Sequence, residues 1–108
     1  MDKDEVINQI KNIVPILKEC LDLDYLILFG SYKNGTNTES SDIDLGIVAN
    51  NLSKEILNKN ISKALLQIHK INFRFEPHFF RTEKWENAQE DSFEYAVKKN
   101  SQVVYVKK

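Results

Sequence analysis

Asp42 and Asp44 are separated by a single isoleucine in the stretch DIDLGIV, residues 42–48. The alternation of polar and apolar residues predicts a strand, on which both carboxylates project from one face with their Cα atoms roughly 6–7 Å apart. Two like charges this close repel each other unless a cation lies between them. Carboxylate oxygens are the ligands that magnesium and manganese prefer. The pair therefore predicts a site for Mg²⁺ or Mn²⁺.

A glycine–serine pair, Gly30 and Ser31, lies ahead of the aspartates, with ten residues between Ser31 and Asp42. The pair follows the apolar run YLILF, residues 25–29, which predicts a buried strand. Ligands of α/β sheets commonly bind at the carboxyl ends of strands. Glycine lets the backbone approach a ligand closely, and backbone N–H groups with the serine hydroxyl can hold phosphate oxygens. We therefore expect a phosphate site beside the metal site, as a nucleoside triphosphate with its magnesium requires.

Glu76 is the best candidate for a third carboxylate. It lies in INFRFEPHFF, residues 71–80, whose alternation predicts another strand. A helix between the two strands would bring this strand alongside the aspartates. Glu76 would then help to hold one of two metals and accept the proton of an attacking hydroxyl. Arg74 and His78 share its predicted face, either as contacts to phosphate or acceptor or as ordinary solvated side chains.

The remaining segments supply the elements around this site. Apolar residues at helical spacing predict two helices, capping and charge signals predict a third, and a last apolar run predicts a strand. In chain order these are helices over 4–21, 53–69 and 91–100 and a strand over 103–106. Pro15 should kink or break the first helix, and Ser53 should cap the second. Asp91 should cap the third helix, which should end with Asn100 in the left-handed conformation.

The predicted order is helix, strand, strand, helix, strand, helix, strand. This order indicates an α/β fold, with a mixed β-sheet and flanking helices. Pro77 suggests either that its strand lies at an edge of the sheet or that regular pairing ends there. The length of 108 residues suits a single small domain over residues 1–108.

Charge and cysteine content argue against several classes of protein. The net charge is −1, from 15 basic and 16 acidic residues, which gives no strong signal for nucleic-acid binding. Cys20 is the sole cysteine of the sequence, so no intramolecular disulfide can form and a reducing compartment fits. The sequence shows neither a signal peptide nor the roughly 20 consecutive apolar residues of a membrane span. We expect a cytoplasmic protein with no membrane segment.

The glycine–serine pair, the ten-residue spacer and Asp-Ile-Asp together resemble the signature of the polymerase β-type nucleotidyltransferase superfamily. The short length and the context Ser-Asp-Ile-Asp-Leu resemble its minimal nucleotidyltransferase (MNT) branch. The resemblance covers roughly residues 22–80, and the tail through FEYAVKKNSQVVY is similar to stand-alone members. It implies a nucleotidyltransferase palm-like core.

The resemblance also implies an activity, which is magnesium-dependent transfer of a nucleotide, AMP from ATP, to a hydroxyl of a protein or small-molecule acceptor. By motif position, Gly30 and Ser31 would hold the triphosphate, and Asp42, Asp44 and Glu76 would bind the metals. In related systems an MNT antitoxin pairs with a HEPN-type ribonuclease and adenylylates it. A helical HEPN-type partner, or a homo-oligomer, would supply the acceptor surface that so short a chain lacks.

Two departures from the family pattern bear on activity more than on fold. Many relatives have alanine and arginine where this chain has Lys33 and Asn34, and Lys33 offers a point charge without the bidentate fork of arginine. The third acid is often aspartate, and Glu76 is one methylene longer. The alternative is a non-catalytic nucleotide-binding or antitoxin module that acts by contact with a partner protein.

Overall fold

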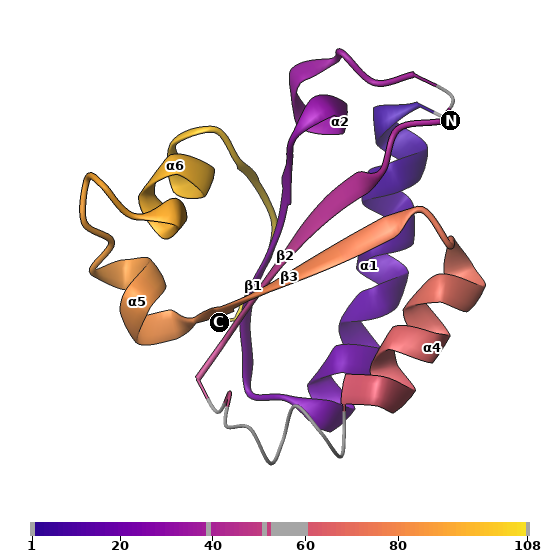
Figure 1. Ribbon diagram of the computed structural model, residues 1–108. Coiled ribbons are helices and arrows are strands. Elements are labelled where there is room, and N and C mark those ends of the chain that lie inside the picture. The colour runs from indigo at the N-terminus through magenta and orange to yellow at the C-terminus, as the bar shows by residue number, and fades with distance from the viewer. Residues whose placement is uncertain (1, 39, 51, 53–60, 108) are drawn as a thin grey trace.

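The computed structural model describes residues 2–38, 40–50, 52 and 61–107. The described helices and strands alternate along the chain, except that α5 and α6 follow one another before the last strand (Figure 1). Their bounds are α1 Lys3–Cys20, β1 Leu23–Phe29, α2 Ser31–Asn34, β2 Ile43–Ala49, α4 Ser62–Ile71, β3 Phe75–Arg81, α5 Thr82–Glu86, α6 Phe93–Lys99 and β4 Gln102–Val106.

The described strands form a four-stranded sheet in the order β3-β2-β1-β4. Strand β1 pairs antiparallel with both β2 and β4, whereas β2 and β3 run parallel. Parallel strands need a crossover connection, and α4 lies in the connection between β2 and β3. The α/β fold with a mixed sheet and flanking helices is therefore confirmed, and β3, which contains Pro77, is an edge strand as predicted.

Helices cover both faces of the sheet. In Figure 1, α1 and α4 lie together on one side of the strands, and α5 and α6 lie on the other. The larger core lies under α1 and α4. Its fully buried members include Val6, Ile10, Ile13, Leu17, Leu26, Leu28, Ile43, Leu45, Ile47 and Ile68. A smaller core lies under α5 and α6. Its buried members are Ile27, Val48, Phe80, Trp85 and Val97.

The alternation of side chains along β2 determines which of them lie on the face of the sheet that α5 and α6 cover. In β2, Ile43, Leu45 and Ile47 belong to the larger core, whereas Val48 belongs to the smaller one. Because successive residues of a strand point to opposite faces, Asp44 shares the face of Val48. The smaller core thus occupies one end of this face, and Asp44 lies toward the other end.

The sequence predicts a kink or a break at Pro15. Helix α1 runs from Lys3 to Cys20 with Pro15 inside it, so the predicted break is wrong. Proline removes one N–H donor and disfavours a helix interior. The buried stripe of α1 on both sides of Pro15 packs in the larger core, and this burial compensates for the lost hydrogen bond. The N-terminus of α1 is capped by Asp2, whose Oδ1 accepts from the N–H of Glu5 at 2.9 Å.

The strand predicted over residues 71–80 is shorter, because Ile71 ends helix α4 and β3 begins at Phe75. Asn72 makes the transition. Its backbone N–H donates to the Ile68 carbonyl at 3.0 Å, and its side-chain oxygen accepts from the N–H of Arg74 at 3.0 Å. The strand prediction over 71–74 is therefore wrong, since the end of a helix and the turn after it mimic a period of two.

The last helix also differs from the prediction. Ser92, not Asp91, caps α6, with its Oγ accepting from the N–H of Tyr95 at 3.2 Å. Asn100 has a φ of −121° and is not left-handed, so this prediction is wrong as well. Helix α5 has too few residues to show helical periodicity and was not predicted. The expected cap at Ser53 lies outside the described residues.

Candidate functional site

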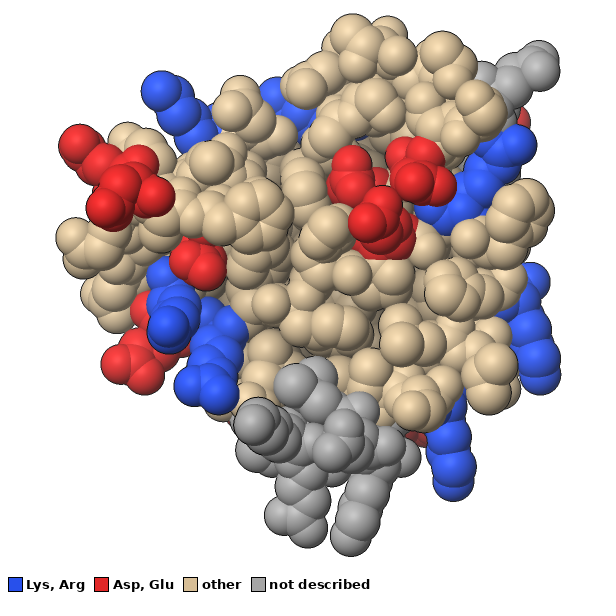
Figure 2. Space-filling model, viewed as in Figure 1, with Lys and Arg blue, Asp and Glu red and all other residues tan. Residues whose placement is uncertain are grey.

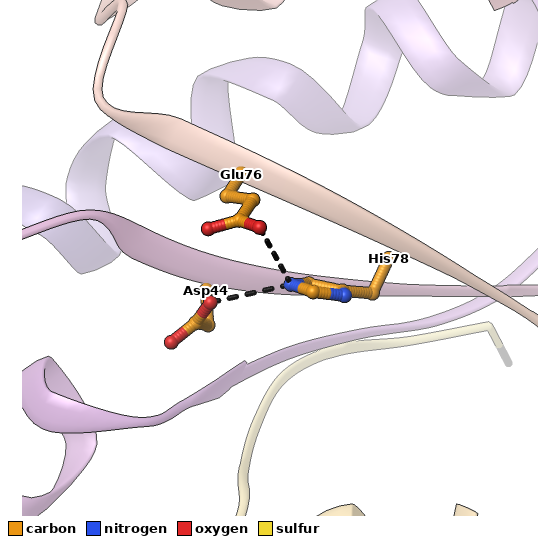
Figure 3. A group of neighbouring side chains, drawn as sticks. All are labelled: Asp44, Glu76 and His78. Atoms are coloured by element: carbon orange, nitrogen blue, oxygen red, sulfur yellow. Dashed lines mark hydrogen bonds and ion pairs between the residues drawn. The ribbon is translucent and has the colours of Figure 1, made fainter. Parts of the chain in front are cut away.

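The register of the parallel pair sets Asp44 directly beside Glu76. Two residues further along, Gly46 of β2 lies beside His78 of β3. Because side chains two residues apart on a strand share a face, Asp44, Glu76 and His78 project together. Figure 3 shows both carboxyl groups directed toward the same ring nitrogen of His78. The sequence predicts that Glu76 lies near the aspartates, and the parallel pairing of β2 with β3 makes it the neighbour of Asp44.

His78 is central to this group. Its Nε2 lies within hydrogen-bond distance of Asp44 Oδ1, at 3.2 Å, and 3.9 Å from Glu76 Oε1. The imidazole meets the ring of Phe29 edge-on, with 5.1 Å between the ring centroids. Side-chain exposure is 27% for both His78 and Asp44 and 53% for Glu76. The group is thus accessible from solvent, while one wall is the aromatic ring of β1.

Among the described residues, Asp44, Glu76 and His78 each offer one ligand atom within 4.8 Å of the others, and Asp42 does not belong to this group. Asp42 is exposed and precedes β2, which begins at Ile43. The predicted role of Asp42 as a metal ligand therefore stays a prediction. It would require the Asp42 side chain to turn toward the group.

Gly30 lies directly behind the Asp44 carboxylate. Its φ of 75° is in the region that favours glycine, and a Cβ built on it would come within 2.1 Å of Asp44 Oδ2. A side chain at this position would therefore both strain the backbone and displace the carboxylate. Glycine is therefore needed here for two separate reasons, the positive φ and the closeness of the Asp44 carboxylate.

A helical turn, α2, begins at Ser31 immediately after Gly30. The first N–H groups of a helix have no partner within the helix and can face an anion. Lys33, in the last turn of α2, adds a positive charge to the same short segment. Gly30 and Ser31 are therefore placed beside the carboxylate group, and their role in binding phosphate remains a prediction.

The residues fit a divalent cation. Ligands of an octahedral ion at about 2.1 Å lie about 3.0 Å apart in neighbouring positions and about 4.2 Å apart in opposite positions. The 3.2 and 3.9 Å separations around His78 Nε2 are close to these values. Acidic side chains also gather near the middle of the face shown in Figure 2, and their charge would attract a cation.

Two further features adjoin the site. Arg74, two residues before Glu76, has a buried Nη1 without a hydrogen-bond partner, and its guanidinium carbon lies 5.7 Å from the centroid of the Phe73 ring. An apolar hollow of about 220 Å³ opens beside Gly30. Its lining residues are Phe29, Gly30, Phe93, Ala96, Val97 and Asn100.

A larger hollow of about 680 Å³ lies apart from the acidic group, between the end of α1 and β4.

His78 is the functional candidate that sequence reasoning did not assign to the metal. The signal was present, because His78 follows Glu76 by two residues on a predicted strand. The distance between the imidazole and Asp44 depends on the parallel register of β2 and β3, which the sequence does not state.

None of the described helices is long and apolar enough to cross a bilayer.

Comparison with known proteins identifies the class. The model of the family described as "Polymerase beta, Nucleotidyltransferase" matches residues 11–108. The chain therefore belongs to the polymerase β nucleotidyltransferase family. A search of curated protein sequences gave no significant match.

Solved structures share the fold. A candidate nucleotidyltransferase from Sulfolobus solfataricus superposes with a TM-score of 0.62 at 14% identity, over 97% of this chain and 84% of that one. A toxin–antitoxin crystallised with AMP-PNP gives a TM-score of 0.58 at 18% identity, over 94% and 73% of the two chains. A mutant of the toxin–antitoxin MntA–HpeT gives 0.52 at 14% identity, over 99% and 75%. At these identities the similarity establishes the fold.

Proposed function

We propose that this protein is a metal-dependent nucleotidyltransferase that moves AMP from ATP to a hydroxyl of an acceptor, and that the acceptor is a protein partner. The observation that carries the proposal is the pairing of Asp44 with Glu76 across two parallel strands, with Gly30 packed against the Asp44 carboxylate. In this arrangement the paired carboxylates lie next to the start of a helical turn, which supports a cation bound beside a triphosphate. Membership of the nucleotidyltransferase family supports the same class of reaction.

Each residue has a defined task in this proposal. Asp44 and Glu76, with Asp42 after rotation of its side chain, would hold the divalent metal, Mg²⁺ or Mn²⁺. Gly30 and Ser31 would bind the triphosphate through backbone N–H groups and the Ser31 hydroxyl. A bound metal would neutralise charge on the phosphates.

The transfer breaks one bond and forms another. The acceptor oxygen bonds to the α-phosphorus, and the bond from that phosphorus to the oxygen bridging the α- and β-phosphates breaks. Pyrophosphate leaves with the bridging oxygen. The Glu76 carboxylate would take the proton of the acceptor hydroxyl. The acceptor ends as an AMP ester.

The structural neighbours support a protein partner, nucleotide binding and the MNT branch. One neighbour is a toxin–antitoxin crystallised with AMP-PNP, an analogue of ATP. Another, MntA–HpeT, carries two aspartate-to-glutamate substitutions two positions apart, the spacing that separates Asp42 from Asp44 here. By analogy we propose that this chain acts as the antitoxin of such a pair. The partner would be a HEPN-type helical protein.

The test is nucleotide transfer with defined variants. The protein is incubated with radiolabelled ATP, a divalent metal and cell extract, and labelled acceptor and released pyrophosphate are measured. Asp42→Ala plus Asp44→Ala should abolish transfer, because the metal ligands are lost. The control Glu90→Ala plus Asp91→Ala removes two exposed acids between α5 and α6 and should leave transfer unchanged. Equal transfer by both double variants would refute the assigned roles.

The acceptor can be identified by mass. Co-purification from the native cell, followed by mass measurement before and after addition of ATP, should reveal a partner that gains one or more AMP units. A gain on the protein itself would indicate a homo-oligomer that modifies its own copies. No gain on any co-purified protein would leave a small-molecule acceptor, which pyrophosphate release would then report.

A second candidate function is neutralisation of a partner by contact, without transfer. The position of Asp42 outside the ligand group favours it, because a site with fewer metal ligands binds metal more weakly. The double aspartate variant separates the two functions. It should still neutralise a co-expressed partner if contact suffices, and it should fail if transfer is required.

A further inference from the structure

The imidazole of His78 lies where a third ligand of the candidate metal would be expected. Its Nε2 is 3.2 Å from Asp44 Oδ1 and 3.9 Å from Glu76 Oε1. Figure 3 shows this nitrogen at the meeting point of the two carboxyl groups, with the ring extending away from them along β3. With its ring proton on Nδ1, the histidine offers the Nε2 lone pair to whatever lies between the carboxylates.

The surroundings hold the ring in this orientation. The edge-on contact with Phe29 places aromatic surface on one side, and the ring of Phe93 lies 6.4 Å from that of His78 between centroids. The backbone of His78 is paired with Gly46 within the parallel ladder. A ligand on a paired strand, packed against aromatic rings, has little rotational freedom to lose when a metal binds.

One nitrogen and two carboxylate oxygens form a donor set different from oxygen alone. Magnesium is bound by oxygen ligands and retains several waters, whereas imidazole suits first-row transition-metal ions. We propose that His78 is a ligand of the metal held by Asp44 and Glu76, so that this site prefers Mn²⁺ or another first-row divalent ion to Mg²⁺. This inference rests on the proposed function for the use of the metal, while its test measures binding alone.

Direct coordination has a spectroscopic signature. The full chain is titrated with Mn²⁺ alone, without nucleotide, and bound manganese is examined by pulsed electron paramagnetic resonance. Nuclear modulation from a coordinating ¹⁴N is expected for the wild type and should disappear in His78→Gln. The control His69→Gln removes the other histidine of the sequence, which bonds the Phe75 carbonyl from helix α4, and should retain the modulation.

Affinity supplies the second readout. Mn²⁺ binding should weaken by at least about tenfold in His78→Gln, since even partners that only orient metal ligands contribute about 10–100-fold. Mg²⁺ affinity, measured by displacement of Mn²⁺, should change much less. Circular dichroism establishes that both variants fold. If His78→Gln does not fold, ¹⁵N labelling of histidine in the wild type replaces it, because the modulation must then change from ¹⁴N to ¹⁵N.

The outcomes are separable from those of the transfer assay. Bound Mn²⁺ without nitrogen modulation, modulation that survives His78→Gln, or equal loss of Mg²⁺ and Mn²⁺ affinity would each overturn the inference. Each would leave only a hydrogen bond between His78 and Asp44, and none would contradict nucleotide transfer. Absence of Mn²⁺ binding by the wild type would overturn it as well. Failure of transfer with the modulation present would refute the proposed function instead.

Discussion

At the scale of single residues, the site depends on one backbone conformation and one contact. Gly30 ends the turn after β1 with a positive φ, and the Asp44 carboxylate occupies the space where a side chain would begin. Glu76 and His78 reach the same carboxylate from the next strand. A single methyl group at position 30 would therefore disturb the candidate metal site without touching either core.

Gly30→Ala should remove metal binding while the protein remains folded. The substitution strains a φ of 75° and pushes against Asp44 Oδ2, so we expect a loss of about 1–3 kcal/mol in the free energy of unfolding and of most Mn²⁺ affinity. Gly35→Ala is a matched control, because Gly35 has a φ of 74° and nothing within 4 Å of its added Cβ. It should lose similar stability and keep its metal. If both variants keep their metal, the contact with Asp44 is unimportant.

Glu76→Gln should make stability less dependent on metal. Like charges on neighbouring strands destabilise the fold, so without metal the variant should melt at the same temperature as the wild type or slightly higher. Added Mn²⁺ should raise the melting temperature of the wild type more, because a ligand that binds only the folded state stabilises it by an amount that increases with its affinity. Glu83→Gln, an exposed acid of α5, should behave as the wild type. An equal response in all three would remove Glu76 from the site.

At the scale of elements, the parallel pair β2–β3 and its crossover bring together residues that are 32 positions apart in the chain, Asp44 and Glu76. The buried side of the pair packs under α1 and α4, and this packing sets the register. A slip of one residue would turn the carboxylates into the larger core. The stability of α1 therefore matters to the site, and α1 contains an unfavourable residue.

Pro15→Ala should stabilise the protein. Pro15 is exposed, lies inside α1 and donates no hydrogen bond, whereas alanine restores the N–H and has the highest helix propensity. We expect a gain of up to about 3 kcal/mol in the free energy of unfolding, measured by urea denaturation. The control Asn12→Ala, at another exposed position of α1, should gain no more than about 0.7 kcal/mol. A loss of stability in Pro15→Ala would mean that the proline shapes the helix for packing.

At the scale of the whole molecule, two helical layers of unequal size cover one sheet. Polar contacts add to the packing at the margins. Tyr25 of β1 donates to Glu86 Oε1 at 2.7 Å at the end of α5, and this hydrogen bond raises the pKa of Tyr25. Lys107, after β4, donates to Asp22 Oδ1 at 2.6 Å, just before β1. The same hydrogen bond lowers the pKa of Asp22 and raises that of Lys107.

Lys107→Met should destabilise the folded protein slightly, and only at pH values between the titration of Asp22 and that of Lys107. The lowered pKa of Asp22 stabilises the fold above the usual value of 3.8, and this contribution is lost as pH falls through the lower folded value. The raised pKa of Lys107 stabilises the fold below 10.5, and this is lost as pH rises through the higher folded value. Melting temperatures of the two proteins should differ near neutral pH and converge in strong acid and strong base.

The size of that difference should also respond to salt. Both groups are exposed, and exposed ion pairs contribute little and are screened by added ions. The difference in melting temperature should therefore shrink in high salt at neutral pH. A difference that persists unchanged in acid, in base and in salt would show that packing of the Lys107 side chain, not its charge, is responsible.

The sequence by itself determined the local features. Helical stripes, apolar runs and the order of elements predicted an α/β fold with a mixed sheet, and the motif containing Gly30 and Asp44 predicted the family that the comparisons confirm. These features arise from neighbours in the chain, whose spacing the sequence states directly. The sequence failed where local patterns are ambiguous, as at residues 71–74, or where tertiary burial overrides propensity, as at Pro15.

Only the tertiary structure decided which side chains meet. The parallel register of β2 and β3 aligns Asp44 with Glu76 and brings His78 to both carboxylates, while Asp42 stays outside the group. The contact of Gly30 with Asp44 likewise depends on the pairing of β1 with β2. Register is set by how whole faces of the sheet bury against α1 and α4, a sum over many distant residues. No short stretch of sequence contains that information.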